Sequence, residues 1–194
     1  MATHTEVFNK DARIQSANPD TNYGNDQLAV LYDTSGGKGV GPFEDRSLAY
    51  VDFSELDIVA ADVTSAYLYM AWTVIQVYGS SFAIRWDRVT ADWDEATVTW
   101  NTQPATDNTV VSDVVVPYTW DSWNVWDITN MIKDAITNRS KIWNAQAHYF
   151  GYDNGYDEEA WYRSSEDETP SLRPYIIINY TVAGAALKTR VMIF

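Results

Sequence analysis

The amino-acid sequence predicts an all-β domain of antiparallel strands with one short helix. Aromatic residues make up 14% of the 194 residues, with 9 Trp and 13 Tyr, and strand-like apolar segments recur along the chain. Aromatic and β-branched residues are enriched in strands. Because a chain of this length can form one sizeable core, we expect one domain over residues 1–182 and a short C-terminal tail over residues 183–194.

The predicted strands share apolar or alternating composition, and turn-forming residues separate most of them. They are residues 5–15, 28–32, 47–53, 66–72, 82–90, 110–116, 145–152, 160–164 and 175–181. Tyr67 and Tyr69 alternate with Leu68 and Met70, which places the two rings on the face opposite the aliphatic core. We expect a hairpin turn at residues 79–81, from which the strand 82–90 returns.

One segment, residues 128–138, has helical periodicity. Its apolar residues fall on one side at helical spacing: Ile128, Met131, Ile132, Ala135 and Ile136. Asp127 is placed to cap the first turn. We expect this helix to close one end of the domain.

The segment 88–104 combines β-forming residues, three acidic residues and a terminating proline. Val89 and Thr90 favour a strand, residues 91–96 suit a turn, and residues 97–100 alternate Thr with Val and Trp. Pro104 then ends the pairing, because proline cannot donate a ladder hydrogen bond. We therefore predict two strands joined by an acidic turn.

This segment resembles the signature of the DNRLRE, or disaggregatase-related, domain, in which RVT..W.E..VTWN..P lies in mid-domain. The matching residues are Arg88, Val89, Thr90, Trp93, Glu95, Val98, Thr99, Trp100, Asn101 and Pro104. Other pieces of that pattern occur in order at residues 11–12, 22–24, 46–56, 65–69, 126–129 and 173–180. The resemblance covers roughly residues 6–181.

The resemblance implies a β-sandwich of jelly-roll type that binds other molecules, often extracellular polysaccharide, and has no chemistry of its own. The chain also resembles stand-alone modules of this kind that occur in tailed phages. We therefore expect a non-enzymatic protein of the virion surface, in a capsid decoration or a tail, that binds capsid subunits or copies of itself. The alternative is an extracellular carbohydrate-binding module of a secreted protein.

Both ends of the chain favour the virion interpretation. The first residues have neither the basic region nor the apolar stretch of a signal peptide, unless a signal has been removed. The tail has two basic residues, no acidic ones and an apolar end, which is typical of a segment that docks on another chain. The predicted docking residues are Lys188, Arg190, Val191, Met192, Ile193 and Phe194.

Charge and composition exclude several classes of function. The formal net charge of −14 would repel nucleic-acid backbones and anionic membranes, so we expect neither as a partner. No apolar run is long enough to span a bilayer. The chain has no Cys and two distant histidines, His4 and His148, so catalytic triads and zinc sites lack their parts.

We predict no catalytic residue. Asp92, Asp94 and Glu95 are crowded into one turn, whereas a glycosidase needs two carboxylates on opposite sides of a cleft. Calcium is the one cofactor for which the sequence offers ligands, because hard cations bind clustered carboxylates. The candidate ligands are Asp11, Asp153, Asp157 and Glu166, and the alternative is that these groups are solvated surface charges.

Sugar binding would use exposed aromatic rings bordered by hydrogen-bonding groups, because a pyranose has an apolar face and a polar rim. The candidates are Tyr67, Tyr69, Tyr152, Tyr156 and Trp161. The alternative is that these rings are core or cross-strand partners, as aromatic residues in a sandwich usually are. An acidic surface would disfavour an anionic glycan such as alginate unless calcium bridged the charges.

Overall fold

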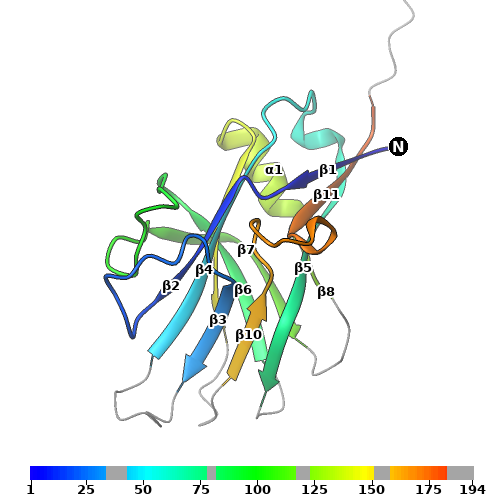
Figure 1. Ribbon diagram of the computed structural model, residues 1–194. Helices are drawn as coiled ribbons and strands as arrows, with labels where there is room; N and C mark the ends of the chain where they lie inside the picture. The colour runs from blue at the N-terminus through cyan, green and yellow to red at the C-terminus, as the bar shows by residue number, and fades with distance from the viewer. Residues whose placement is uncertain (34–42, 78–81, 117–122, 151–157, 183–194) are drawn as a thin grey trace, which may run out of the picture.

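The chain folds into an all-β sandwich with one α-helix at one end (Figure 1). A computed structural model describes residues 1–33, 43–77, 82–116, 123–150 and 158–182. The strands pair antiparallel throughout these residues. The predicted fold class is therefore confirmed.

The larger layer contains β4, the three strands that pair with it, and two further strands. In chain order these strands are β2 (Lys10–Gln15), β3 (Leu28–Asp33), β4 (Phe43–Asp52), β6 (Phe82–Val89), β7 (Thr106–Val116) and β9 (Ile142–Tyr149). β4 pairs with β2, β3 and β9, and β6 then pairs with both β9 and β7.

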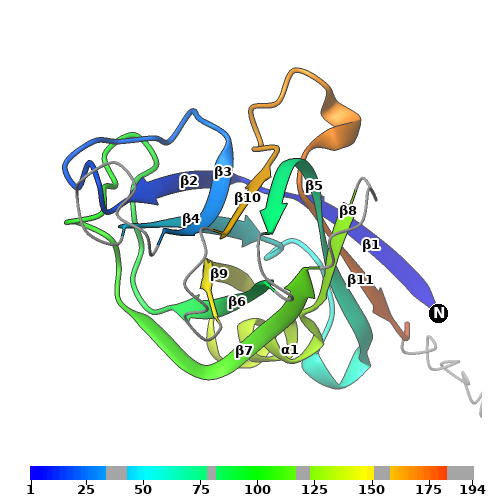
Figure 2. The ribbon, with the colours of Figure 1, turned by 90° about the horizontal axis from the view of Figure 1, so that it is seen from below.

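The smaller layer has the order β1-β11-β5-β8 (Figure 2). Its strands are β1 (Ala2–Val7), β5 (Val63–Val77), β8 (Trp123–Asp127) and β11 (Tyr175–Tyr180). β5 is long enough to belong to both layers, because its second half pairs with β10 (Glu158–Tyr162), and β10 also pairs with β3. The hydrogen bonding is thus continuous from one layer to the other.

Large aromatic side chains fill the space between the layers. Trp86 lies at the centre, with its ring centroid 6.2 Å from that of Trp126 and 5.5 Å from that of Trp143. Tyr162 packs edge-on against Trp126 at 5.9 Å. All four side chains are almost fully buried, and burial of one large apolar side chain stabilises a fold by about 1.5–3 kcal/mol.

The helix α1 (Thr129–Asn138) closes one end of this core, as the sequence predicts (Figure 1). Met131, Ile132 and Ala135 are its buried residues, on the predicted side. The Asp127 carboxylate accepts a hydrogen bond of 2.9 Å from the backbone N–H of Thr129, the first helical residue. Two short 3-10 turns complete the fold, η1 (Ala60–Asp62) and η2 (Pro170–Leu172).

Three sequence predictions about strands are wrong. The predicted strand 5–15 is two strands, β1 and β2, which belong to different layers. The predicted hairpin between residues 66–72 and 82–90 does not form, because β5 pairs with β8, β10 and β11, whereas β6 pairs with β7 and β9. Residues 97–100 form turns and irregular structure in place of a strand.

Among the described residues, no helix has the length and hydrophobicity needed to cross a lipid bilayer. The predicted tail, residues 183–194, lies outside the described residues, as does the predicted hairpin turn at 79–81.

Candidate functional site

The outer face of the smaller layer carries a row of aromatic and apolar side chains. Strand pairing places Tyr69 beside Tyr175 on one side and Val125 on the other, and Val7 lies beyond Tyr175. The alternate residues of the same strands, such as Leu68 and Ile176, are fully buried in the core. The row therefore faces away from the core because of the strict alternation of β-strands.

The rings of this row hold one another in place. Tyr69 and Tyr175 are stacked, with ring centroids 4.9 Å apart and an interplanar angle of 8°. Trp123 packs edge-on against Tyr175 at 5.4 Å. Burial and the neighbouring Tyr69 raise the pKa of the Tyr175 hydroxyl above its usual value, so Tyr175 is a protonated donor at neutral pH.

A second cross-strand row lies beside the first and brings Tyr67 between Ile177 and Asp127. Tyr67 and Asp127 also line an open groove of about 800 Å³, whose other walls come from β7 and the start of α1. We call the surface formed by Tyr67, Tyr69, Trp123, Val125, Tyr175 and Ile177 the aromatic platform.

Hydroxyl and amide groups border the platform. The Thr3 hydroxyl donates to Asn179 Oδ1 at 2.9 Å, and the Asn179 amide donates to the Ser65 hydroxyl at 3.0 Å. Among the outward positions of these four strands that the structure describes, Asp127 is the one charged residue. An apolar centre with an uncharged polar border suits a ligand that has an apolar face and hydroxyl groups at its edge.

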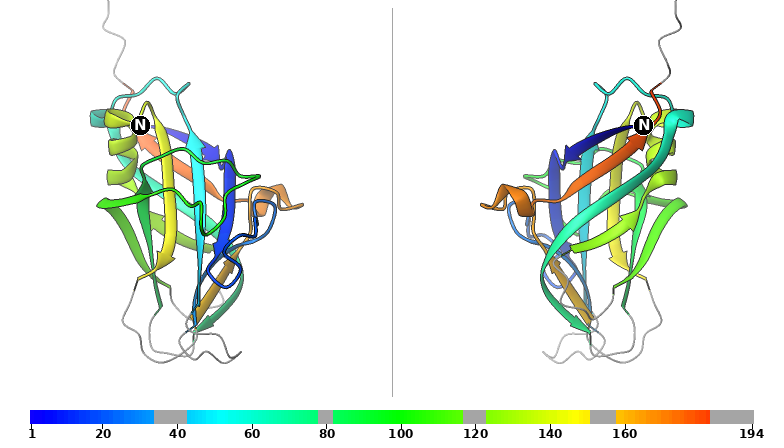
Figure 3. Two further views of the ribbon diagram at one scale, coloured as in Figure 1. Left: turned by 90° about the vertical axis from the view of Figure 1, so that its left-hand side faces the viewer. Right: turned by 90° about the vertical axis from the view of Figure 1, so that its right-hand side faces the viewer.

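The apolar side chains of the platform and of the neighbouring strand β1 are accessible. Val7 and Val125 are 48% and 38% exposed, although large apolar side chains are usually buried in a monomer. In the right-hand view of Figure 3, β5, β11 and β1 are seen from outside the sandwich with no described segment across them. The platform is thus a preformed surface, open to solvent in the described part of the chain.

The sequence of the chain also carries a family signature. The family described as carbohydrate-binding module family 96 matches residues 2–180, which is nearly the whole chain. The chain belongs to carbohydrate-binding module family 96. No curated protein matches the sequence. This match supports the alternative prediction, a carbohydrate-binding module, better than the virion protein that was the main one. The DNRLRE assignment and the phage origin stay predictions.

Residues 90–105, which connect β6 to β7 and contain most of the DNRLRE-like segment, form a cover over the larger layer. The left-hand view of Figure 3 shows this cover crossing in front of β9 and β4. Trp93 and Val98 pack on Ala12, Ile14 and Leu48 in a second hydrophobic cluster, separate from the main core. The indole N–H of Trp93 donates to Asn144 Oδ1 on β9 at 2.9 Å. The alternation of residues 97–100 therefore reflects this packing, and no strand pair forms.

Arg46, another residue of the resemblance, fixes the far end of the cover. Its guanidinium lies over the ring of Trp100, 4.7 Å from the centroid, and forms an ion pair of 2.8 Å with Glu44. It also donates to the side-chain oxygens of Gln103 and Gln146 at 3.3 and 3.4 Å. Arg46 thus links the strand β4 to both the cover and β9.

The turn at residues 22–24 clamps the cover from the side. The Asn22 amide donates to the backbone carbonyls of Glu95 at 2.8 Å and Val98 at 2.7 Å. A Cβ atom on Gly24 would lie 2.2 Å from the carbonyl oxygen of Glu95, so only glycine fits there without movement. The motifs at 22–24, 46–56 and 88–104 therefore act together, and their role is structural.

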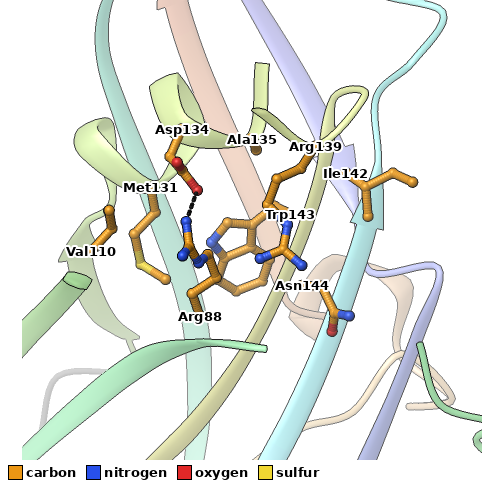
Figure 4. Close-up of a pocket in the computed structure, with 9 residues that line it drawn as sticks. All are labelled: Arg88, Val110, Met131, Asp134, Ala135, Arg139, Ile142, Trp143 and Asn144. Carbon is orange, nitrogen blue, oxygen red and sulfur yellow. Dashed lines mark hydrogen bonds and ion pairs between the residues drawn. The ribbon is translucent and has the colours of Figure 1, made fainter. Parts of the chain in front are cut away.

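Arg88 also has a structural role, in the small pocket of Figure 4. It pairs with Asp134 of α1 at 2.9 Å and with Asp107, and so ties β6 to the helix. The pocket encloses about 10 Å³, which is space for about one water molecule. Its size excludes a sugar.

The turn carboxylates have structural partners too. Asp92 pairs with Lys10 at 2.8 Å, and the Asp94 carboxylate accepts from the backbone N–H of Ala96 at 2.8 Å. Glu95 accepts a hydrogen bond of 2.7 Å from the backbone N–H of Asp11. These bonds position the turn, and carbohydrate-binding module families are typically non-catalytic.

The predicted glycan residues separate into three groups. Tyr67 and Tyr69 lie on the platform, as described above. Trp161 lies elsewhere, on β10, where the Arg13 guanidinium is 4.9 Å from its ring centroid and 4.2 Å from that of Tyr23. Tyr152 and Tyr156 lie outside the described residues.

Sequence reasoning missed Trp123, Val125, Tyr175 and Ile177 as members of the platform. The alternation of Tyr175 and Ile177 with Ile176 and Ile178 was a signal for the β11 residues. No local signal marks Trp123 and Val125, because their place beside Ala71 and Tyr69 depends on the pairing of β8 with β5.

The predicted calcium ligands are brought together in part. Asp11 and Glu166 are neighbours, and Glu95 joins them as a third carboxylate that sequence reasoning did not assign to a metal. Asp153 and Asp157 lie outside the described residues. The predicted docking residues Lys188, Arg190, Val191, Met192, Ile193 and Phe194 also lie outside them, so their role stays a prediction.

Proposed function

We propose that this member of carbohydrate-binding module family 96 binds a polysaccharide on the aromatic platform. The observation that carries the proposal is the stacked pair Tyr69 and Tyr175, with Trp123 against it, on an open sheet face. A sugar ring that lies on these rings covers its apolar face, while its hydroxyl groups reach the polar border. Family membership supports sugar as the ligand in preference to another amphipathic molecule.

The electrostatics of the platform favour an uncharged glycan. The described outward residues of the four strands include no Lys or Arg, and Asp127 borders the groove beside Tyr67. The chain as a whole has a net charge of −14. A polyuronate would therefore be repelled by the negative charge and would find no guanidinium partner. A neutral polysaccharide of hexoses or pentoses meets no such repulsion.

The shape of the platform favours an extended chain. The two cross-strand rows lie side by side across β11, β5 and β8, and neighbouring strands are about 4.8 Å apart. Several sugar rings of one polysaccharide can then lie along the sheet at once. An open face can bind sugar units in the middle of a long polysaccharide. A deep pocket would accept only the end of such a polysaccharide.

The test is a binding assay with intact protein and defined polysaccharides. Insoluble cellulose, xylan, chitin and β-1,3-glucan are used for pull-down, and soluble glucans, mannans and alginate for affinity electrophoresis and calorimetry. We expect retention on at least one neutral polysaccharide. The variants Tyr69→Ala and Tyr175→Ala should each weaken that binding by about tenfold or more, equal to about 1.4 kcal/mol.

A matched control is available within the chain. Tyr32 and Tyr149 form another stacked tyrosine pair, with ring centroids 4.8 Å apart, on β3 and β9 of the larger layer. Tyr32→Ala should leave the affinity for the polysaccharide unchanged. If Tyr32→Ala lost binding and Tyr69→Ala kept it, the site would lie elsewhere and the proposal would be overturned. Binding of the protein to alginate and to no neutral polysaccharide would also overturn it.

The alternative function, docking on capsid or sister subunits at a virion surface, rests on residues outside the described part of the chain. Family membership favours the carbohydrate-binding function over it. Deletion of residues 183–194 separates the two functions. We expect glycan binding to survive this deletion, whereas oligomerisation that is lost with the tail would favour the docking function.

A further inference from the structure

Three carboxylates from distant parts of the chain converge next to β2. Asp11 lies on β2, Glu95 in the cover between β6 and β7, and Glu166 in the connection between β10 and β11. One ligand oxygen of each lies within 4.8 Å of the others. Like charges at such distances repel one another unless a cation or a proton lies between them.

The Asp11 side chain is built into the fold with one oxygen unsatisfied. Asp11 has no exposed surface, and its Oδ2 accepts a hydrogen bond of 2.8 Å from the backbone N–H of Ser165. Its Oδ1 is buried and has no hydrogen-bond partner in the described part of the chain. A buried, unpaired carboxylate oxygen is costly, so an occupant of this position is expected.

Hydrogen bonds orient the other two carboxylates around Asp11. Glu95 accepts from the backbone N–H of Asp11 at 2.7 Å through Oε1. Glu166 Oε1 accepts from the Ser165 hydroxyl at 2.5 Å, and the backbone of the same Ser165 binds Asp11. Glu95 is therefore held by the backbone of Asp11, and Ser165 holds both Asp11 and Glu166. Such hydrogen bonds orient the ligands of a preformed ion site.

No basic side chain forms an ion pair with the cluster among the described residues. Lys10 is near Glu95, but its ammonium group pairs with Asp92 and the carbonyl of Trp93. Burial and the charge of Glu166 raise the pKa of Asp11 well above its usual 3.8, and burial raises the pKa of Glu95. Without a bound cation, three ionised carboxylates at this position are therefore unfavourable.

We propose that Asp11, Glu95 and Glu166 bind one calcium ion that joins the three segments. Carboxylates and water are the ligands that calcium prefers, and the partly exposed Glu95 and exposed Glu166 leave room for water. Two oxygens on one calcium, at about 2.3–2.6 Å each, can lie up to about 5 Å apart. All three ligand atoms therefore lie within the span of one calcium ion, and the flexible coordination of calcium suits such a site better than the strict octahedral geometry of magnesium.

The ion has a structural role that is separate from the platform. It links β2 directly to the cover through Glu95, and the cover shields the second hydrophobic cluster. It also fixes the connection that leads from β10 to β11. Calcium binding therefore stabilises the folded state, because the unfolded chain does not bring the three ligands together.

The first test measures thermal unfolding of the intact chain after treatment with EDTA, with and without CaCl2. At a calcium concentration one hundredfold above its dissociation constant, we expect Tm to rise by about 5–10 °C. Calorimetry should give one calcium per chain. Magnesium chloride at the same concentration should give a smaller shift. No shift and no heat with 10 mM CaCl2 would overturn the proposal.

The variant Asp11→Asn separates calcium binding from folding. Its amide oxygen can still accept from Ser165, but the buried charge is gone, so we expect a folded protein without the calcium shift. Asp94→Asn is the matched control, because Asp94 lies in the same turn as Glu95 but outside the cluster, and it should keep the shift. A calcium shift retained in Asp11→Asn would contradict the proposal.

Discussion

The two layers of the sandwich treat their outer faces in opposite ways. The face of β4 and β9 is covered by residues 90–105. Trp93 of this cover is buried against the layer, and Asn144 and Gln146 of β9 are buried beneath the cover. The face of β1, β11, β5 and β8 has no described cover, and the apolar side chains Val7 and Val125 are exposed. Both faces are rich in aromatic rings, so composition alone does not distinguish them.

The difference teaches how the DNRLRE-like pattern is distributed over the fold. The residues of the signature segment serve the covered face, through contacts such as those of Trp93 and Arg46. The open face carries other pieces of the same pattern, at residues 65–69 and 173–180, whose alternating strand residues form the platform. One sequence pattern therefore supplies both the residues that hold the cover and strand residues of the open face.

The largest expected effect is on the covered face. Trp93→Ala removes a ring that is 7% exposed, together with its hydrogen bond to Asn144, and should lower the free energy of unfolding by about 3–5 kcal/mol. Urea unfolding followed by tryptophan fluorescence measures the loss. Tyr69→Ala, on the open face, should cost about 1 kcal/mol. Equal losses in the two variants would remove the distinction between the faces.

A smaller effect is expected where the cover meets the turn at residues 22–24. Gly24→Ala forces a methyl group against the carbonyl of Glu95 and should lower the free energy of unfolding by about 1–3 kcal/mol. Differential scanning calorimetry should show a lower Tm and unchanged glycan affinity. Asn25→Ala, at an exposed neighbouring position, is the control and should unfold like wild type.

Arg46→Lys tests the other end of the cover. Lysine keeps the charge but loses the planar group that lies over Trp100 and the paired hydrogen bonds to Glu44. We expect a loss of about 1–2 kcal/mol in the free energy of unfolding. A double-mutant cycle with Glu44→Gln should show coupling. Additive losses would mean that the ion pair contributes little to holding the cover.

The smallest effect on stability belongs to the open face. Val125→Thr replaces an exposed apolar side chain by one of nearly the same shape, and the free energy of unfolding should change by no more than about 0.5 kcal/mol. Chemical denaturation measures it. A loss as large as that of Trp93→Ala would indicate that Val125 is covered in solution and that the open face is an interface.

Periodicity made much of the fold predictable. The helix and the outward direction of Tyr67 and Tyr69 follow from spacing alone, because each element has one apolar side to bury. The break at Phe8 and Asn9 was missed because no Gly or Pro marks it. Asn9 instead accepts a hydrogen bond from the backbone N–H of Asp52 as the chain passes from one layer to the other.

The site was less predictable because it depends on pairing between distant strands. Asp11 and Glu166 were identified as candidate ligands by residue type, but the place of Glu95 beside Asp11 depends on how the cover folds back over β2. In the same way, Tyr175 joins Tyr69 only through the pairing of β11 with β5. Long-range strand pairing leaves little local signal in a single sequence.

The parallel packing of Tyr69 against Tyr175 has a consequence for selectivity among sugars. Each ring already restrains its neighbour, so little side-chain freedom is lost when a sugar docks. The entropy penalty of binding then comes mainly from straightening the polysaccharide itself. Stiff, ribbon-like chains should for that reason bind more tightly than coiled or branched ones of the same monomer.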